Sequence, residues 1–372
     1  MNKAVTLLLL GGISLLVLLS LINAGIILGL DSRMDAKISQ IKEASRPASI
    51  QLTLIQPDCD GCTDASPLIE KIKQSNINLT SEQALSPQDA SSLIDAYGIK
   101  RLPAIILEGE VGKISAPNFE ARGNGLVYDQ IAPPYYDPAS GTVRGRVNAQ
   151  VIDAPSSCKQ CLDMKTIVDI FTQQGVFFAS DAEFKADDPQ AQKLIRDNGI
   201  AVLPALIFSE DAEAYPDVLQ VMTQGGFKKS GNLYVYESHL PYYNLSDKRV
   251  YGLVELIMLT DKGCTACYDV SLHKQILANF GVAISSEKTV DISSAEGQQL
   301  LQQHGITSVP TIILKGDAVL YPGFSDVWGT VGTIGKDNTF VFRDNGALGA
   351  GFSYKNLTSG EVITVPAENP SA

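Results

Sequence analysis

One sequence pattern recurs three times along this 372-residue chain, and it constrains the fold more than any other feature. Each copy holds an apolar pair, a Gly-Ile pair, an apolar residue followed by proline, and then an apolar run. The copies align without gaps as ASSLIDAYGIKRLPAIIL (90–107), AQKLIRDNGIAVLPALIF (191–208) and GQQLLQQHGITSVPTIIL (297–314). A pattern that repeats at ~100 residues, the size of a small domain, predicts tandem domains of one fold.

A pair of cysteines separated by two residues (CxxC) precedes each copy at a nearly constant distance. The first cysteine lies 44, 46 and 46 positions before the proline. The pairs use all 6 cysteines of the chain: Cys59 and Cys62, Cys158 and Cys161, and Cys264 and Cys267. Because the motif and its spacing recur together, we expect the cysteines and the proline to belong to one structural unit.

The order of elements within each unit predicts an α/β fold. An apolar strand comes first, at 49–55, 146–152 and 252–259. We expect the CxxC to open a helix, and a buried strand to follow the proline. Between them, a second helix should stop at a glycine, which is Gly98, Gly199 or Gly305. A run of strand, helix, strand, helix and strand forms layered α/β domains.

An element rich in proline and tyrosine closes the units. PPYYDPASGTVRGRV (133–147) matches LPYYNLSDKRVYGLV (240–254), and FSYKNLTSGEVITVP (352–366) is a degenerate copy. Junctions of this composition are stiffer than Gly/Ser linkers. The predicted domains are therefore 49–145, 146–251 and 252–372, the last with a C-terminal tail.

The N-terminus carries a long uncharged run, Ala4–Leu30. As a helix it would measure ~40 Å, enough to cross a ~30 Å hydrocarbon core. Lys3 precedes the run, so residues 1–30 are expected to form an uncleaved signal anchor, with the N-terminus in the cytoplasm and the domains outside it. A cleaved signal peptide is the alternative, although its apolar region is usually only ~7–15 residues. Residues 31–48 are predicted to form a polar stalk.

The bulk charge narrows the range of partners. The chain has 41 acidic and 29 basic residues, a formal net charge of −12. Binding of nucleic acid needs clustered Lys and Arg to neutralise phosphates, so it is not expected. Three Asn-x-Ser/Thr tripeptides, at Asn78, Asn244 and Asn356, permit glycosylation in an exported chain.

Four chemistries use a CxxC pair. Haem attachment needs a histidine directly after the second cysteine, but Thr63, Leu162 and Tyr268 stand there. Zinc needs four ligands, usually from pairs close in sequence, whereas these pairs lie ~100 residues apart, so no metal is expected. A structural disulfide across two residues closes a tiny loop and stabilises little. Electron exchange is favoured because the pair recurs at the same point of the repeat.

A strand, a CxxC at a helix start and an X-Pro before a buried strand together resemble the thioredoxin superfamily, with protein disulfide isomerase and DsbA-like proteins as analogues. The resemblance covers three tandem copies, from residue 49 to about residue 330. It implies that the prolines follow cis peptide bonds and that the backbone just before them pairs with an extended substrate. The implied substrate-binding residues are Leu102, Pro103, Leu203, Pro204, Val309 and Pro310.

The two cysteines of each pair have different expected roles. A helix N-terminus stabilises a thiolate, so the first cysteines are the expected nucleophiles. The second cysteines are expected one turn inside the helices, where they resolve the mixed disulfide. Thioredoxins bury an acid beneath the site. Thr53, Ile152 and Met258 lie near that place here, so no counterpart is expected.

An aspartate follows each pair in the pattern CxxCxD, as Asp64, Asp163 and Asp269. It could relay protons to the resolving cysteine. Acids are also common in the first turn of a helix, where the dipole favours them, and this structural role is the expected one.

The sequence thus predicts a membrane-anchored, extracytoplasmic thiol–disulfide oxidoreductase. Its partners would be proteins with thiols or disulfides, a redox protein that recharges the CxxC pairs, and the membrane, through residues 4–30. It would need no cofactor beyond its redox-active disulfides. The alternative is a non-enzymatic surface scaffold or binding protein with internal CxxC disulfides, because a fold alone does not fix a function.

The uncharged N-terminal run generates a testable prediction. Fractionation should leave the intact chain in membranes after a salt or carbonate wash, because the hydrocarbon core holds a spanning helix. A soluble mature chain that begins near Gly25 would instead establish a cleaved signal peptide.

Overall fold

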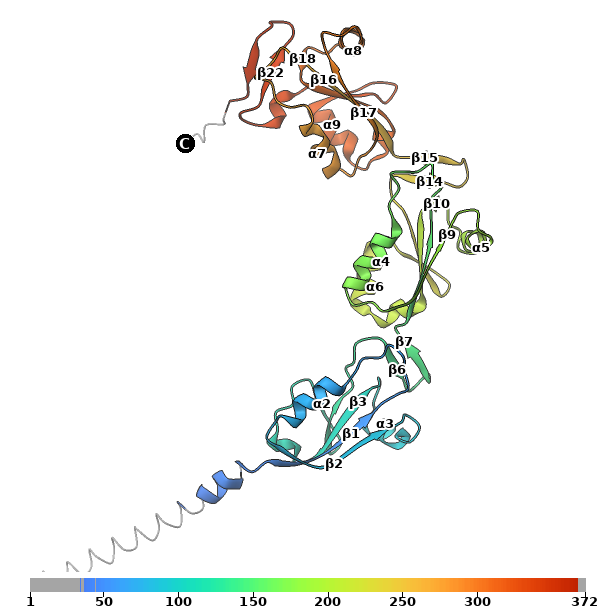
Figure 1. Ribbon diagram of the computed structural model, residues 1–372, viewed down its shortest axis with the longest axis vertical. Helices are drawn as coiled ribbons and strands as arrows, with labels where there is room; N and C mark the ends of the chain where they lie inside the picture. Colours follow the sequence, from blue (N-terminus) through green and yellow to red (C-terminus); the bar gives the residue numbers. More distant parts are fainter. Residues whose placement is uncertain (1–33, 35–36, 44, 367–372) are drawn as a thin grey trace, which may run out of the picture. The chain divides into compact units, whose positions relative to one another are not determined.

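The computed structural model describes residues 34, 37–43 and 45–366 (Figure 1). The expected signal anchor, residues 1–30, lies outside the described residues, as does part of the expected stalk. No helix in the described part of the chain is both long and apolar enough to cross a membrane. The chain divides into two compact units, Met1–Arg144 and Gly145–Ala372.

The first unit is built on a five-stranded sheet with strand order β2-β1-β3-β5-β4. Its strands are β1 (Ala48–Ile55), β2 (Ile77–Leu85), β3 (Ala104–Gly109), β4 (Glu120–Arg122) and β5 (Gly125–Tyr128). The two long helices are α2 (Ser66–Lys73) and α3 (Ser91–Tyr97). β1 runs parallel to β2 and antiparallel to β3, so the apolar strand predicted at 49–55 lies inside the sheet, with a neighbour on each side.

The two helices of the first unit cover opposite faces of the sheet (Figure 1). Successive residues of a strand point to opposite faces. Ile69 of α2 therefore packs in a cluster with Leu52, while Ile94 of α3 packs in another with Ile55 and Ile106. This double cover explains why β1 and β3 are apolar along most of their length.

The second unit contains two further five-stranded sheets. The first has the order β12-β13-β11-β8-β9. Its strands are β8 (Val147–Ile152), β9 (Phe178–Phe184), β11 (Ala205–Ser209), β12 (Lys228–Ser230) and β13 (Leu233–Glu237), and its helices are α4 (Met164–Gln173), α5 (Pro189–Asn198) and α6 (Pro216–Gln224). As in the first unit, the first strand lies between a parallel and an antiparallel neighbour.

The other sheet of the second unit has the order β17-β16-β19-β21-β20. Its strands are β16 (Leu253–Thr260), β17 (Ala283–Asp291), β19 (Thr311–Gly316), β20 (Gly332–Ile334) and β21 (Phe340–Phe342), and its helices are α7 (Leu272–Asn279), α8 (Ala295–His304) and α9 (Phe324–Val331). The pairings of β16 with β17 and β19 repeat those of β1 with β2 and β3.

The helix stops predicted from the sequence are confirmed. Helices α3, α5 and α8 end at Gly98, Gly199 and Gly305, whose φ angles are 58°, 64° and 57°. Only glycine adopts this left-handed conformation without steric strain, so it ends the helix and turns the chain toward the proline.

The repeated Pro/Tyr-rich element forms a β-hairpin in each case, and we call these the closing hairpins. They are β6 (Tyr135–Asp137) with β7 (Thr142–Arg144), β14 (Tyr242–Asn244) with β15 (Arg249–Tyr251), and β22 (Ser353–Asn356) with β23 (Val362–Thr364). The third, whose sequence is a degenerate copy, has kept the same form.

The predicted α/β class is confirmed, since the described residues form mixed sheets covered by helices. Each of the ranges 49–145, 146–251 and 252–372 holds one five-stranded sheet and one closing hairpin. The division into compact units separates only the first of these ranges from the others. The three-domain boundaries remain a prediction.

Candidate functional site

Each CxxC pair forms a disulfide across a tight turn. The bridges are Cys59–Cys62, Cys158–Cys161 and Cys264–Cys267, with Cα–Cα distances of 5.5, 5.4 and 5.4 Å. In each turn the amide of the second cysteine donates to the carbonyl oxygen of the first, at 3.4, 3.4 and 3.2 Å. Five of the six cysteines are half-buried, and Cys158, 8% exposed, is buried.

The turns lie before the helices and not at their first residues, so the predicted position of the second cysteines inside a helix is wrong. α2 begins at Ser66, α4 at Met164 and α7 at Leu272. Only in α4 does the aspartate that follows the pair cap the helix; the N-caps of α2 and α7 are Ala65 and Ser271, without a side-chain hydrogen bond. The Asp163 carboxylate accepts the amide N–H of Lys165 at 2.9 Å and caps α4. An aspartate used as a cap sets the helix start behind itself.

The other two aspartates make the same kind of contact. Oδ1 of Asp64 accepts the amide of Ser66, and Oδ1 of Asp269 accepts that of Ser271, each at 2.9 Å. These backbone hydrogen bonds lower the pKa of both carboxyls. The expected place of the three aspartates in a first helical turn is thus wrong, since each stands before its helix and accepts a backbone amide there.

The sheet register brings each CxxC beside its proline. The last paired residue of the strand before the CxxC lies opposite the residue that follows the proline. These pairs are Ile55 with Ala104, Ile152 with Ala205, and Leu259 with Thr311. All six residues are fully buried. Cysteine and proline are therefore neighbours in space although more than forty residues separate them in the chain.

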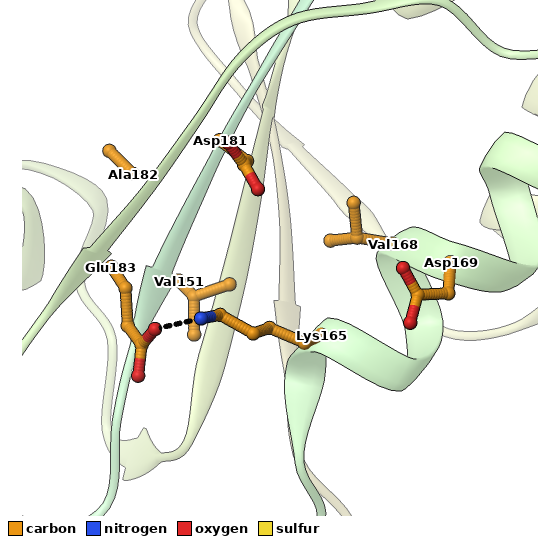
Figure 2. Close-up of a pocket in the computed structure, with 7 residues that line it drawn as sticks. All are labelled: Val151, Lys165, Val168, Asp169, Asp181, Ala182 and Glu183. Atoms are coloured by element: carbon orange, nitrogen blue, oxygen red, sulfur yellow. Dashed lines mark ion pairs between the residues drawn. The ribbon is translucent and has the colours of Figure 1, made fainter.

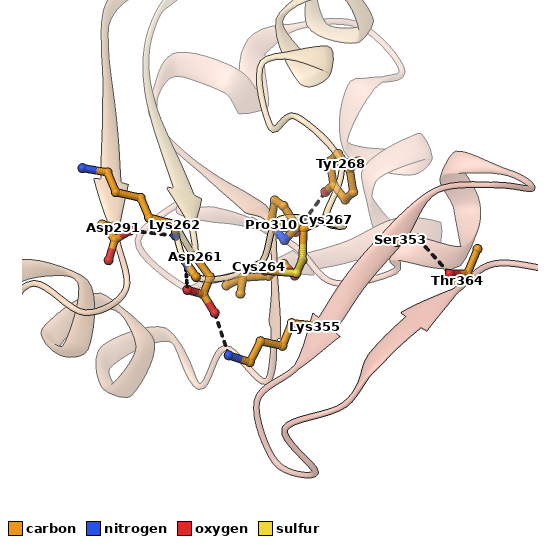
Figure 3. Close-up of a disulfide and its surroundings, with 12 residues drawn as sticks. Asp261, Lys262, Cys264, Cys267, Tyr268, Asp291, Pro310, Ser353, Lys355 and Thr364 are labelled. Atoms are coloured by element: carbon orange, nitrogen blue, oxygen red, sulfur yellow. Dashed lines mark hydrogen bonds and ion pairs between the residues drawn. A yellow bond between two sulfur atoms is a disulfide. The ribbon is translucent and has the colours of Figure 1, made fainter.

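The prolines themselves lie as the resemblance implied. Pro103, Pro204 and Pro310 follow cis peptide bonds. The Sγ atom of Cys161 lies 3.9 Å from the carbonyl oxygen of Leu203, and that of Cys267 lies 3.9 Å from the oxygen of Val309. Figure 3 shows Pro310 beside the Cys264–Cys267 bridge. A carbonyl oxygen beside a thiol favours its neutral form over the thiolate. The different roles of the first and second cysteines remain a prediction.

The backbone before each proline is already paired within its own unit. The N–H and C=O of Leu102 bond the C=O and N–H of Tyr136, both at 2.9 Å. β10 (Val202–Leu203) pairs with β14, with Leu203 opposite Tyr243. β18 (Ser308–Val309) pairs with β22, with Val309 opposite Lys355. Pairing of these residues with a substrate remains a prediction, and it requires that the closing hairpin leave.

The third site contains a buried polar cluster that the sequence did not reveal. The Tyr268 hydroxyl lies 2.9 Å from the Pro310 carbonyl oxygen, 2.9 Å from Oδ1 of Asn345 and 3.0 Å from Nε2 of His273. Nδ2 of Asn345 in turn donates to Oγ of Ser308 at 3.1 Å. The cluster joins the residue after Cys267 to the segments on both sides of the proline.

Burial keeps this cluster uncharged. His273 and Asn345 are each 2% exposed. Burial lowers the pKa of His273 to about 4 and raises the pKa of Tyr268, so both are neutral at pH 7. One hydroxyl hydrogen serves one acceptor at a time, so the Nε2–H tautomer of His273 completes the network by donating to the Tyr268 oxygen. The cluster thus holds the loop through neutral hydrogen-bonding groups.

An ion pair also ties the third closing hairpin to its CxxC loop. Nζ of Lys355, on β22, lies 2.7 Å from Oδ2 of Asp261, and Lys355 lowers the pKa of this carboxyl. Oδ1 of Asp261 accepts the amide of Gly263 at 2.8 Å, directly before Cys264 (Figure 3). The Tyr268 amide donates to the Ser353 carbonyl oxygen at 2.8 Å.

The second site has an acidic neighbour that was missed. Asp153 directly follows β8, one residue after Ile152, where the sequence comparison with thioredoxins found no acid. Burial, together with a hydrogen bond and repulsion from Glu183, raises the pKa of Asp153 to about 6. Glu183 is held ionised by Lys165, which lies with it in a pocket of about 380 Å³ between α4 and β9 (Figure 2).

Comparisons with known proteins find only weak likenesses. No protein-family model matches the chain. No curated protein matches it either. Among solved structures, the NTD_N/C domain of alkylhydroperoxide reductase AhpF from Enterococcus faecalis is 13% identical, with a TM-score of 0.17 over 48% of this chain and 89% of that one.

Two other solved structures cover more of the chain. The zinc-bound form of human ERp44 is 13% identical, with a TM-score of 0.14 over 78% of this chain and 87% of that one. Form II of ERdj5 is 12% identical, with a TM-score of 0.15 over 73% of this chain and 38% of that one. At such scores we base no argument on them.

The Tyr268 cluster generates a stability prediction. Tyr268→Phe leaves the Pro310 carbonyl and the Asn345 amide oxygen without their shared donor, and should lower the free energy of unfolding by about 1–3 kcal/mol. Denaturant melts of the full chain measure this. Tyr354→Phe is the matched control, because the hydroxyl of this half-buried tyrosine has no hydrogen-bond partner among the described residues. Equal effects of both changes would contradict a structural role of the cluster.

Asp153 generates a pH prediction. In the unfolded chain its pKa is ~3.9, whereas the folded value is about 6. Between pH 4 and 6 the unfolded state therefore loses this proton first, so the free energy of unfolding falls as the pH rises. Asp153→Asn should flatten this part of the profile and stabilise the chain at pH 7. The exposed Asp187→Asn is the control, and a slope unchanged by Asp153→Asn would refute the assignment.

Proposed function

We propose that the chain is a membrane-anchored, extracytoplasmic thiol–disulfide oxidoreductase that exchanges disulfides with the thiols of other proteins. The observation that carries the proposal is the repetition of one arrangement: a disulfide in a tight turn that the sheet register brings beside a proline. A disulfide that served only as a staple would stabilise little across two residues. All 6 cysteines occur in this arrangement.

The exchange needs no group beyond the cysteines. A substrate thiolate attacks Sγ of the first cysteine, forming a mixed disulfide and breaking the CxxC bridge. The electron pair passes to Sγ of the second cysteine, which takes up a proton. A second substrate thiolate then attacks the substrate sulfur of the mixed disulfide and releases the first cysteine as a thiolate. The substrate loses two electrons to the CxxC pair, and a redox partner must take them away.

The first cysteines, Cys59, Cys158 and Cys264, are proposed as the sulfurs that form the mixed disulfide. In two of the three sites a backbone carbonyl oxygen lies against the second sulfur and keeps it protonated when the pair is reduced. A protonated thiol does not compete for the substrate, while it can still lose its proton and resolve a mixed disulfide one turn away.

The anchor and the compartment are proposed from the sequence. The uncharged run Ala4–Leu30 after Lys3 supports a single-pass anchor with the N-terminus in the cytoplasm. Six cysteines that are all paired fit an oxidising compartment. The net charge of −12 supports protein partners over nucleic acid.

One observation favours a second candidate, a non-enzymatic scaffold with internal disulfides. The backbone beside each disulfide is occupied by the closing hairpin of its own unit, as a bridge that never exchanged would allow. The two candidates differ in whether the bridges turn over.

The test compares the full chain with a triple variant. The full chain should accelerate reduction of insulin by dithiothreitol, or refolding of a scrambled substrate, because each turnover needs a first cysteine. Cys59→Ala, Cys158→Ala and Cys264→Ala together should bring the rate to background. Ser157→Ala, at an exposed position next to Cys158, is the control. A full chain no faster than the triple variant would establish the scaffold.

A further inference from the structure

The closing hairpins pair with the segment before the proline in all three sheets. In the first, the Thr63 amide, directly after Cys62, donates to the Pro134 carbonyl oxygen at 3.4 Å, and its hydroxyl donates to the Ala132 oxygen at 3.0 Å. The strand that follows, β6, pairs with Leu102. The hairpin thus contacts both the CxxC loop and the residue before the proline.

The second and third sites use longer ladders. The Leu245 amide donates to the Ala201 oxygen at 3.0 Å, and the Leu357 amide to the Thr307 oxygen at 2.8 Å. Antiparallel pairs alternate between bonded and non-bonded types, so two residues further along, Leu203 and Val309 use both their N–H and C=O groups on the hairpin. This matches the pair of bonds between Leu102 and Tyr136 in the first site.

We propose that the closing hairpins determine which thiols reach the disulfides. An extended polypeptide that lies along the CxxC turn must displace the hairpin strand, whereas a small thiol reaches the sulfur with the hairpin in place. In the second and third sites the carbonyl oxygen of the residue before the proline lies 3.9 Å from the second sulfur. The backbone of this residue is already paired with the closing hairpin. The inference deepens the proposed function, on which it rests.

Displacement of the hairpin strand changes the hydrogen-bond energy little, because the incoming polypeptide remakes the two backbone bonds to the residue before the proline that it breaks. Side-chain contacts therefore decide how easily each hairpin leaves. The first has one backbone bridge to the proline segment, Leu102–Tyr136, and Arg101 lies over its Tyr135 ring at 4.6 Å. The third adds the Lys355–Asp261 ion pair and the Tyr268–Ser353 bond to a two-residue ladder. The first site should open most readily and the third least.

Amide exchange on trapped adducts tests the displacement. The full chain keeps Cys59 and has its other cysteines replaced by serine. Cys59 as thiolate attacks a cysteine peptide activated as its thionitrobenzoate disulfide and releases thionitrobenzoate, which leaves a stable mixed disulfide. The probe peptide has a central cysteine between Thr and Val residues, which favour an extended chain. The control adduct carries 2-mercaptoethanol in its place.

The two amides of the first bridge give opposite readouts. In the peptide adduct the Tyr136 N–H should exchange about tenfold faster or more, because its acceptor is taken, while the Leu102 N–H stays protected by the peptide carbonyl. Both should stay protected in the mercaptoethanol adduct. Equal protection of Tyr136 in the two adducts would overturn the inference. Failure of Cys59 to take up either probe would instead reject exchange at this site, and with it the proposed function.

The third site provides a second, independent variant. With Cys264 as the remaining cysteine, Lys355→Met removes the ion pair to Asp261 and should raise the ratio of peptide to mercaptoethanol rates about threefold, the effect of a weak surface pair. Taking a ratio cancels any change in the reactivity of the sulfur itself. Lys336→Met, at an exposed turn between β20 and β21, is the control. An unchanged ratio for Lys355→Met would contradict a gate at this site.

Discussion

The whole site depends on one antiparallel register, the pairing of the strand before the CxxC with the strand after the proline. In the first sheet Ile55 lies opposite Ala104, and the same step recurs in the other two. Because these positions are fully buried, a slip of one residue would turn the apolar side chains of both strands to the wrong faces. Packing of the core therefore fixes the distance between the disulfide and the proline, and the loops contribute less to it.

Periodic features were predictable from the sequence, and non-local ones were not. The apolar strands and the glycines that end helices, such as Gly98, depend on local sequence patterns, so both were predicted correctly. The start of α4 could not be predicted, because a few hydrogen bonds decide whether Asp163 caps the helix or lies in its first turn. Asp153 was missed because its raised pKa depends on burial and on Glu183, a residue on a neighbouring strand. The Leu102–Tyr136 bridge likewise joins segments whose register no local pattern encodes.

The residue after the second cysteine distinguishes three otherwise similar sites. Thr63 ties its loop to the first closing hairpin through one hydroxyl. Leu162 stands at the same place in the second site and is exposed. Tyr268 in the third is the centre of a buried network that reaches His273. A buried polar group adds stability only if all its partners are present, so the third loop is held more firmly but tolerates fewer substitutions.

The closing hairpins cover a strand edge that the sheet register would otherwise leave exposed. The short segment before each proline is a strand edge, and an exposed edge pairs with any extended chain. A chain with three such edges beside three disulfides would be open to pairing between its own copies. Covering each edge with a hairpin of the same unit removes that hazard while the sulfurs stay partly exposed. Replacing one paired strand by another is nearly neutral in hydrogen bonds. Substitutions in the closing hairpins, at positions such as Tyr136 and Lys355, can therefore change how easily a substrate reaches a site without altering its cysteines.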